Sequence, residues 1–342
     1  MWRLQDGPKH NEWKKDQSEF TPTGDHRMFK KIALTTGAIM LCANVAAADI
    51  LALGSTARGG TSQIGRALAA AVSEASPHQM RPQEVANTSD YIPLVNAGEL
   101  EFGIANVVQT LYGKSGTGMS EGRPNENLLM AATLMPFRAA FITPADSDVK
   151  TVADLKGKRV PSFSKGTLGY HVVNAYLANA GLTEADIVPV PVPNFPRMWA
   201  SFGEGSTDVT VVVVGAANAR EFDATMGGIR YLDFDETDEA VERMNEYLPQ
   251  MYLSRLDSEA NIPGITEPTD IMVYDYTLFT SSATSDGHVY DVVKAIYDSQ
   301  DKLLKAGPFF AGLDKNEMGK DVSMDYHPGA IKFFEEKGIW NR

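Results

Sequence analysis

The chain has 342 residues, and its 43 % hydrophobic content is enough for the cores of about two domains. Its 44 acidic and 31 basic residues give a formal net charge of −13, so a nucleic-acid backbone or an anionic membrane surface would repel it. The composition excludes both partners. It does not exclude a small anionic ligand, because the capture of a carboxylate depends on a few local donors.

The beginning of the chain has the pattern of an export signal. From Met28, two lysines precede an apolar run that ends at Val45, and three alanines follow. These are the parts of a secretory signal peptide, and the run is too short to span a bilayer. We expect residues 28–48 to be a cleaved signal peptide, so that the mature protein resides in the periplasm. We interpret residues 1–27 as an upstream extension that forms no structure.

The single cysteine, Cys42, lies inside this signal, so the mature chain contains no thiol. A disulfide, a thiol nucleophile and a thiolate metal site are therefore excluded from the mature protein. No later segment is long and apolar enough to cross a membrane, so a role in transport requires a separate membrane protein.

A strand, a short polar loop and a helix follow one another four times along the rest of the chain. The first unit has a strand at residues 50–53 and a glycine loop at residues 54–61. The helix after this loop should bury one face, formed by Ile64, Leu68, Ala71 and Val72. The second unit has a strand near residues 84–86, a short helix that stops at Gly98, and a further strand at residues 102–105.

The next apolar run, "LLMAATLMPFRAAFITP", predicts one or two buried strands, and the polar linker at residues 144–148 indicates a change of domain. The third unit then begins with a strand at residues 159–163 and a loop at residues 164–167. The fourth has an unbroken β-branched strand at residues 209–214, followed by a small-residue loop and a helix. Each unit therefore ends a strand at a loop that opens a helix.

The last part of the chain predicts a strand at "IMVYDYTLFTSS" and helices at residues 288–306, 315–322 and 329–338. The alternation of strands and helices predicts an α/β fold with mainly parallel sheets and helices on both faces. We expect two lobes with a ligand cleft between them. Lobe 1 would comprise residues 49–144 and 256–342, and lobe 2 residues 145–255.

The repeated strand-to-helix junctions point to a ligand. In an open α/β sheet, ligands bind beyond the carboxyl ends of the strands, where helix N-termini converge. Each helix start offers unpaired N–H groups and the positive end of a macrodipole. A single junction is more commonly a helix cap that faces water. Four junctions in two lobes could together surround one small anion.

The glycine loop does not match either nucleotide motif. In a P-loop, Gly54 and Gly59 would have the right spacing, but Gly60 stands where the phosphate-binding lysine belongs. The dinucleotide motif also fails, because Thr56 stands where its second glycine belongs. The loop instead suits a carboxylate, held by backbone amides near residues 59–62 and by three hydroxyls, those of Thr56, Thr61 and Ser62.

Four segments resemble one known family. They are "LGSTARGGTSQIGRALA", "ANTSDYIPLVNAGELEFGIAN", "VADLKGKRV" and "HPGAIKFFEEKGI". Together they resemble the solute receptors of TRAP transporters in the TAXI subgroup (TRAP-associated extracytoplasmic immunogenic proteins), over about residues 50–340. "ADLKGKRV" recurs in many two-lobed periplasmic binding proteins, whereas the glycine loop together with "HPGA" is more specific to TAXI receptors.

The resemblance implies a two-lobed periplasmic binding protein of type II-like fold. We also predict that the protein is a monomer, that it is not an enzyme and that it needs no cofactor. It would capture a small organic anion, such as glutamate or 2-oxoglutarate, and deliver it to a TRAP-type membrane permease. The ligand-binding residues that it implies are Thr56, Gly60, Thr61, Ser62, Thr88, Ser89, Ser164, Lys165, Gly166 and Thr167. The family often carries aromatic residues after the glycine pair, where this chain has Thr61-Ser62-Gln63. This difference leaves the identity of the ligand open.

Two further residues are candidates for the site from their own chemistry. Arg138 interrupts an apolar run near the expected hinge, where its guanidinium could pair with a ligand carboxylate or could turn to solvent or to a nearby acid. Asn106 follows a strand end and could contact a neutral ligand group or cap a helix. Arg58 and Arg197 are rival carboxylate clamps.

The motifs of several enzyme classes are missing from the sequence. The four histidines after the signal have no H-x-x-x-H or H-E-x-x-H spacing, and no serine lies in G-x-S-x-G. We therefore predict no catalytic residue, no metal site and no cofactor. Two alternatives to a transport receptor remain, a secreted α/β hydrolase and the sensory module of a signalling system.

Overall fold

The computed structural model describes residues 48–258 and 262–340. The upstream extension at residues 1–27 and all but the last residue of the expected signal peptide lie outside the described residues. Within the described part of the chain, no helix is both long enough and apolar enough to cross a membrane.

The ten strands found among the described residues form one large sheet and one small sheet. The strands are β1 (Ile50–Thr56), β2 (Gln79–Val85), β3 (Phe102–Asn106), β4 (Leu128–Pro144), β5 (Arg159–Ser162), β6 (Val188–Pro191), β7 (Thr210–Val213), β8 (Ile229–Tyr231), β9 (Tyr252–Leu256) and β10 (Thr269–Ser281). The large sheet has the order β2-β1-β3-β10-β4-β7, with β9 added beside β10 and β8 beside β4, and β5 and β6 form the small sheet.

Ten α-helices are described. They are α1 (Gly60–Ala75), α2 (Thr88–Asn96), α3 (Val107–Ser115), α4 (Leu168–Asn179), α5 (Phe195–Gly203), α6 (Ala217–Met226), α7 (Asp238–Asn245), α8 (Asp286–Asp298), α9 (Gln300–Ala306) and α10 (Pro328–Lys337). Short 3-10 turns occur among them, including one at Pro308–Phe310 after α9 and one at Lys315–Glu317.

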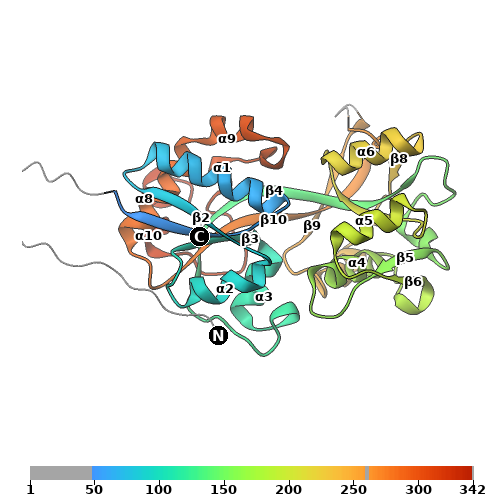
Figure 1. Cartoon of the computed structure of the whole chain (residues 1–342), viewed down its shortest axis with the longest axis horizontal. Coiled ribbons are helices and arrows are strands. Elements are labelled where there is room, and N and C mark those ends of the chain that lie inside the picture. The colour runs from blue at the N-terminus through green and yellow to red at the C-terminus, as the bar shows by residue number, and fades with distance from the viewer. Residues whose placement is uncertain (1–47, 259–261, 341–342) are drawn as a thin grey trace, which may run out of the picture. The chain divides into compact units, whose positions relative to one another are not determined.

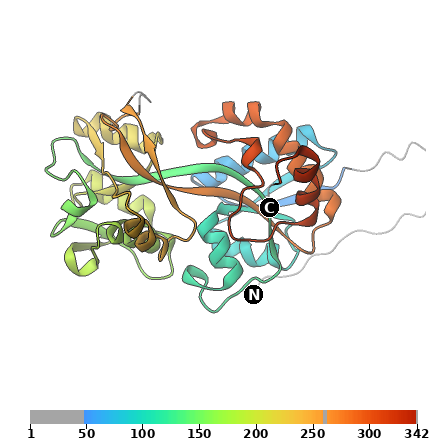
Figure 2. The ribbon, with the colours of Figure 1, turned by 180° about the vertical axis from the view of Figure 1, so that it is seen from behind.

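Two long strands connect the two lobes. β4 and β10 pair antiparallel over most of their length, and Figures 1 and 2 show them running between two groups of elements. One group holds β1–β3 with α1, α8 and α10, and the other holds β5 and β6 with α4, α5 and α6. All 13 residues of β10 are buried, which is expected of a strand covered on both faces.

Helix α1 shows how the sequence pattern produces the packing. It begins after Gly59, whose φ of 83° is favourable for glycine and costly for other residues. Its predicted apolar face is confirmed, because Ile64, Leu68 and Val72 are fully buried. This face packs on β1 and β2, and α8 lies beside α1. The arrangement places the first residues of α1 at the carboxyl end of β1.

Three details of the prediction are wrong. The large sheet is mixed: β1 pairs parallel with β2 and β3, but β10 pairs antiparallel with β3, β4 and β9, and β4 also pairs antiparallel with β7 and β8. The expected helix at residues 288–306 is two helices, since α8 ends before Ser299 and α9 follows it. The expected helix at residues 315–322 is a single 3-10 turn.

Candidate functional site

A pocket of about 220 Å³ lies where β4, the end of β7 and the segment after α9 meet. Its walls are mainly apolar and include Phe137, Val214, Leu256 and Phe309. Arg138 is the one charged residue among the described residues that line it. A concave, apolar site with a single cation suits a small anion that carries some apolar surface.

Arg138 occupies the middle of β4. Its backbone lies opposite Val273 of β10, and its carbonyl accepts a hydrogen bond of 3.0 Å from the Val214 N–H at the end of β7. The residue is half-buried, and its Nε atom is buried without a hydrogen-bond partner among the described residues. A buried N–H of a cation that lacks a partner is costly, and a bound carboxylate would satisfy it.

Helix α6 begins at the wall of this pocket. Gly215 and Ala216 line the pocket, and Ala216 is the N-cap of α6, which has no side-chain cap. The Ala219 N–H donates to Asn218 Oδ1 at 3.0 Å, so the N–H groups at the start of α6 without a capping side chain are those of its first two residues. They present the positive end of the helix dipole beside Arg138, which favours an anion at this position.

Helix α1 begins close to the same pocket. Its N-cap, Gly59, also provides no side-chain cap. A Cβ atom on Gly60 would lie 3.2 Å from the ring of Phe309, so the glycine loop lies directly against the pocket wall. The Thr61 hydroxyl is hydrogen-bonded to the Tyr276 hydroxyl. Burial raises the pKa of Tyr276 to about 12, so this hydroxyl stays protonated at neutral pH.

Stacked aromatic rings support the pocket from one side. The ring of Phe137 is parallel to that of Phe309 within 5°, with centroids 6.3 Å apart. The same ring stacks on Tyr274, with centroids 5.6 Å apart, and lies 5.3 Å from Tyr276. These contacts connect the start of α1, through Tyr276 and Phe309, to the residue that precedes Arg138. The structure thus brings together three of the predicted residues, Gly60, Thr61 and Arg138.

Four predicted residues of the first lobe form hydrogen bonds with their own neighbourhood. The Thr56 hydroxyl donates to the Arg58 carbonyl at 2.9 Å, and the Ser62 hydroxyl donates to Glu84 at 3.3 Å. The Thr88 hydroxyl accepts a hydrogen bond from the Tyr91 hydroxyl, within α2. Asn106 caps α3, because its side-chain oxygen accepts from the Gln109 N–H at 2.9 Å. The fifth, Ser89, is exposed on α2.

The predicted loop of the second lobe does not line the pocket. Thr167 caps α4, because its hydroxyl oxygen accepts from the Tyr170 N–H at 3.3 Å and donates to the Ser164 carbonyl at 2.9 Å. Ser164, Lys165 and Gly166 are exposed. The role of this loop in ligand binding remains a prediction.

The two rival arginines lie elsewhere. Arg197 forms a double hydrogen bond with Glu204, at 3.1 and 3.2 Å, and Arg58 is exposed in the glycine loop. Neither lines the pocket beside Arg138.

Four residues of the site were not predicted from the sequence: Tyr276, Phe137, Phe309 and Ala216. The stretch "VVVVGAANA" contained a usable signal for Ala216, because an alanine at the N-cap of a helix that follows a buried strand offers no side-chain acceptor to the first N–H groups. No local signal marks the aromatic residues, which come from segments far apart in the sequence.

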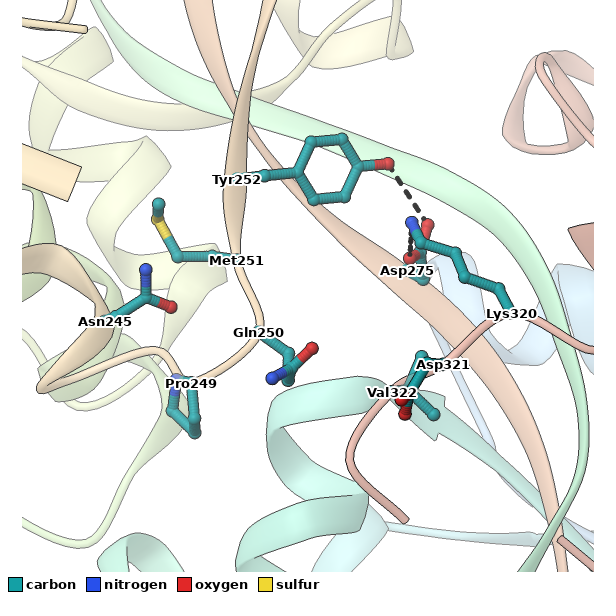
Figure 3. A pocket seen from close by; sticks show the side chains of 9 residues that line it. All are labelled: Asn245, Pro249, Gln250, Met251, Tyr252, Asp275, Lys320, Asp321 and Val322. Atoms are coloured by element: carbon teal, nitrogen blue, oxygen red, sulfur yellow. Dashed lines mark hydrogen bonds and ion pairs between the residues drawn. The ribbon is translucent and has the colours of Figure 1, made fainter. Parts of the chain in front are cut away.

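A second pocket, of about 450 Å³, is lined by the start of β9, by Asp275 of β10 and by the segment at residues 320–322 (Figure 3). The Lys320 ammonium donates to the Asp275 carboxylate at 2.6 Å and lies 4.5 Å from the centre of the Tyr252 ring. The Tyr252 hydroxyl donates to the same carboxylate at 3.2 Å, and burial raises the pKa of Tyr252. In the larger pocket, Lys320 and Asp275 are therefore already paired with each other.

The fold is shared with proteins of known structure. A structure described as a periplasmic transporter matches with a TM-score of 0.53 at 15 % identity, covering 86 % of this chain and 94 % of that one. PhnD1 from Prochlorococcus marinus, solved in complex with methylphosphonate, matches with a TM-score of 0.50 at 11 % identity, covering 85 % of this chain and 99 % of that one. At these identities, the likeness concerns the fold alone.

These features define a type II periplasmic binding protein fold, built from α/β elements with a mixed sheet. The model of the NMT1-like family matches residues 53–338. The chain therefore belongs to this family, which is the family of TAXI solute-binding proteins, and the predicted resemblance is confirmed. Its members are solute-binding proteins of transporters and not enzymes.

Proposed function

We propose that the protein captures a small organic anion with its carboxylate at Arg138 and delivers it to a TRAP-type permease. The observation that carries the proposal is the buried Nε of Arg138, which has no hydrogen-bond partner in the described part of the chain and lies at a pocket of about 220 Å³. A guanidinium binds a carboxylate through two parallel hydrogen bonds, and this geometry is stronger and more selective than a single neutral bond.

The uncapped starts of α1 and α6 support the same ligand charge. α6 begins in the pocket wall, and α1 begins at Gly60, against Phe309. Each contributes about half an elementary charge at its N-terminus, which attracts an anion. The apolar lining would cover the carbon skeleton of the ligand. These features favour a carboxylate with a short apolar chain over an inorganic anion.

We propose that binding closes the two lobes about β4 and β10. The lobes would comprise residues 49–144 with 256–342, and residues 145–255, as the sequence indicates. Arg138 belongs to the first of these ranges, and Ala216 belongs to the second. An anion that contacts both residues would bridge the lobes and stabilise the closed state relative to the open one.

A thermal-shift panel tests the ligand class. The purified protein would be heated with monocarboxylates, dicarboxylates and amino acids, each matched with its neutral primary amide. A receptor gains stability from its ligand by mass action, so we expect at least one carboxylate to raise Tm and its amide to leave Tm unchanged. Equal stabilisation by an acid and its amide, or no stabilisation by any acid, would contradict a carboxylate site at Arg138.

The delivery step needs its own experiment. We expect export to the periplasm as a monomer, and uptake into vesicles that contain a TRAP-type permease only when this protein is added. Mass spectrometry of the exported protein would locate the end of the signal peptide. Ligand binding without permease-dependent uptake would favour the sensory alternative.

A further inference from the structure

A group of histidine and aspartate side chains lies away from the hinge pocket, where β1, β2 and α8 begin. Asp49 precedes β1, His78 precedes β2, and His288 lies in the first turn of α8. Each offers one potential metal-ligand atom, and these three atoms lie within 4.8 Å of one another. His288 and Asp49 are 239 residues apart, so no sequence motif could reveal the group.

The two imidazole rings already contact carboxylates. His288 Nε2 lies 3.1 Å from Asp49 Oδ2, and His78 Nε2 lies 3.0 Å from Asp291 Oδ2. The ring centroids of the two histidines are 5.0 Å apart, with the ring planes nearly perpendicular. Four groups of the kinds that bind transition metals are therefore held together by three separate segments of the chain.

His78 carries the strongest indication of a missing ligand. Only 7 % of the residue is exposed, and its Nδ1 atom is buried without a hydrogen-bond partner among the described residues. In a neutral imidazole, one nitrogen donates and the other accepts. The Asp291 carboxylate can only accept when ionised, so it places the proton on Nε2 and leaves the Nδ1 lone pair unused.

We propose that Asp49, His78 and His288 form a binding site for a divalent transition metal ion of the Zn²⁺ class. Asp291 would act as a positioning residue that holds the His78 ring, since metal-bound histidines commonly donate their second N–H to a carboxylate. Two imidazoles and one carboxylate leave a fourth tetrahedral position for water. Ca²⁺ does not fit this group, because it prefers six to eight oxygen ligands.

The side chains need only small movements to bind the ion. Tetrahedral Zn²⁺ holds its nitrogen and oxygen ligands about 2 Å away, which places them about 3.3 Å from one another. The Asp49 side chain is 63 % exposed and that of His288 is 29 % exposed, so both can rotate toward buried His78. The bound ion would tie the starts of β1 and β2 to α8, within the lobe that holds α1.

Calorimetric titration of the whole protein, purified without a histidine tag and stripped of metal, would measure the site with Zn²⁺ as the probe. We expect one equivalent to be lost in two separate variants, Asp49→Asn and His288→Asn. Asp291→Asn should weaken the affinity of that equivalent by about 10- to 100-fold, as for other groups that orient a metal-bound histidine. Asp298→Asn is the matched control on α8, because Asp298 pairs with Lys294 and should leave the affinity unchanged.

Replacement of Zn²⁺ by Co²⁺ gives a second readout, because a four-coordinate cobalt site absorbs visible light and a hydrated ion absorbs weakly. Asp49 is exposed, so its variant should keep the native circular dichroism spectrum even if His288→Asn disturbs α8. Wild-type affinity and Co²⁺ absorption in Asp49→Asn and His288→Asn would overturn the proposal, as would a wild-type protein that binds no Zn²⁺.

Discussion

Two basic side chains lie near the hinge, and their surroundings differ. Arg138 lies opposite Val273 on β10, whereas Lys320 reaches Asp275, two residues further along the same strand. Lys320 is paired with a carboxylate, but the Nε of Arg138 has no partner among the described residues. The pocket beside Lys320 is the larger of the two, at about 450 Å³ against about 220 Å³. The proposed anion site therefore depends on the unsatisfied Nε of Arg138 and not on pocket volume.

The helix starts show the same contrast. Asn106 caps α3 and Thr167 caps α4 with their own side chains, whereas Gly59 and Ala216 leave α1 and α6 without a side-chain cap. A capped helix start has less to offer a ligand, because the chain has already satisfied one of its N–H groups. Helices α7 and α9 also begin without a side-chain cap, so we infer an anion site from α1 and α6 alone, which begin beside the Arg138 pocket or against its wall.

The largest effect is expected from Arg138→Met. The affinity for the carboxylate should fall about 100-fold, equivalent to about 3 kcal/mol, because a buried charged hydrogen-bonded pair is lost. The free energy of unfolding without ligand should not fall, since the substitution removes a half-buried cation whose Nε has no partner within residues 48–258 and 262–340. Calorimetric titration and denaturant unfolding would measure the two quantities.

Arg138→Lys provides the matched control, because it keeps the charge and loses the two parallel hydrogen bonds. Its affinity should lie between those of the wild type and Arg138→Met. Wild-type affinity in Arg138→Met would show that Arg138 does not bind the ligand. The difference in pairing between Arg138 and Lys320 would then say nothing about where the ligand binds.

Lys320→Met should lower the stability of the protein and leave its ligand affinity nearly unchanged. The Asp275 carboxylate, only 7 % exposed, would keep the Tyr252 hydroxyl but lose its cation. We expect the free energy of unfolding to fall by about 2 kcal/mol, less than for a fully buried pair because the Lys320 side chain is 35 % exposed. Ligand affinity should stay within about threefold, or about 0.7 kcal/mol.

Denaturant unfolding and calorimetry on the same sample would separate the two outcomes. Adding Asp275→Asn to Lys320→Met should restore part of the stability, since the carboxylate charge no longer needs a partner. A loss of ligand affinity as large as that of Arg138→Met would place the ligand in the larger pocket.

The sequence predicted those elements that depend on residues close together along the chain. The strand before the glycine loop, the buried face of α1 and the family motifs could all be identified, because each depends on residues close together in sequence. The direction of β10 could not be predicted, since its antiparallel pairing depends on contacts with β3, β4 and β9. Short elements with weak periodicity, such as α7 and β9, were not predicted.

In the candidate site, too, only the residues marked by their local sequence could be predicted. Gly60 and Arg138 stood out as a glycine in a strand-to-helix loop and a cation in an apolar run. Tyr276, however, meets Thr61 across 215 residues, which no window of sequence shows. The polar residues after the strands pointed to a ligand, yet Asn106 and Thr167 cap their own helices, because the nearest unpaired N–H groups belong to the same chain segment.

Paired substitutions at two helix starts give a smaller effect. Ala216→Asp would supply α6 with a cap, so the free energy of unfolding without ligand should rise by about 1 kcal/mol. The added carboxylate would occupy the N–H groups and repel an anion, so ligand affinity should fall about tenfold. Thr167→Ala should lower stability by about 1 kcal/mol, through loss of the α4 cap, and leave affinity unchanged.

Thermal unfolding and calorimetric titration of both variants would test this pair. Reduced affinity in Thr167→Ala would return the loop at residues 164–167 to the binding site. Unchanged affinity in Ala216→Asp would exclude the start of α6 from it.

The smallest expected effect is the dependence of stability on pH. Stability should change with pH over a range in which ligand affinity does not. Burial lowers the pKa of His171 and of His327 below the unfolded value of about 6.5. The unfolded chain therefore binds more protons than the folded chain just below pH 6.5. Stability is fully present above that pH and falls as the pH drops toward the folded pKa of each histidine.

The contacts of His327 explain why its protonation should destabilise the fold, and they suggest a control variant. Its Nε2 lies 3.0 Å from the Thr284 carbonyl, and its Nδ1 accepts from the Gly329 N–H, so a second proton would break the cap of α10. Asp286, 3.7 Å from Nδ1, opposes the shift but does not reverse it. His327→Asn keeps a capping acceptor that does not titrate, so denaturant unfolding between pH 8 and pH 5 should show a shallower loss of stability. A guanidinium group does not titrate between pH 8 and pH 5, so ligand affinity should be constant until the ligand itself is protonated. An affinity that falls in parallel with stability would mean that a titrating group, and not the guanidinium, holds the anion.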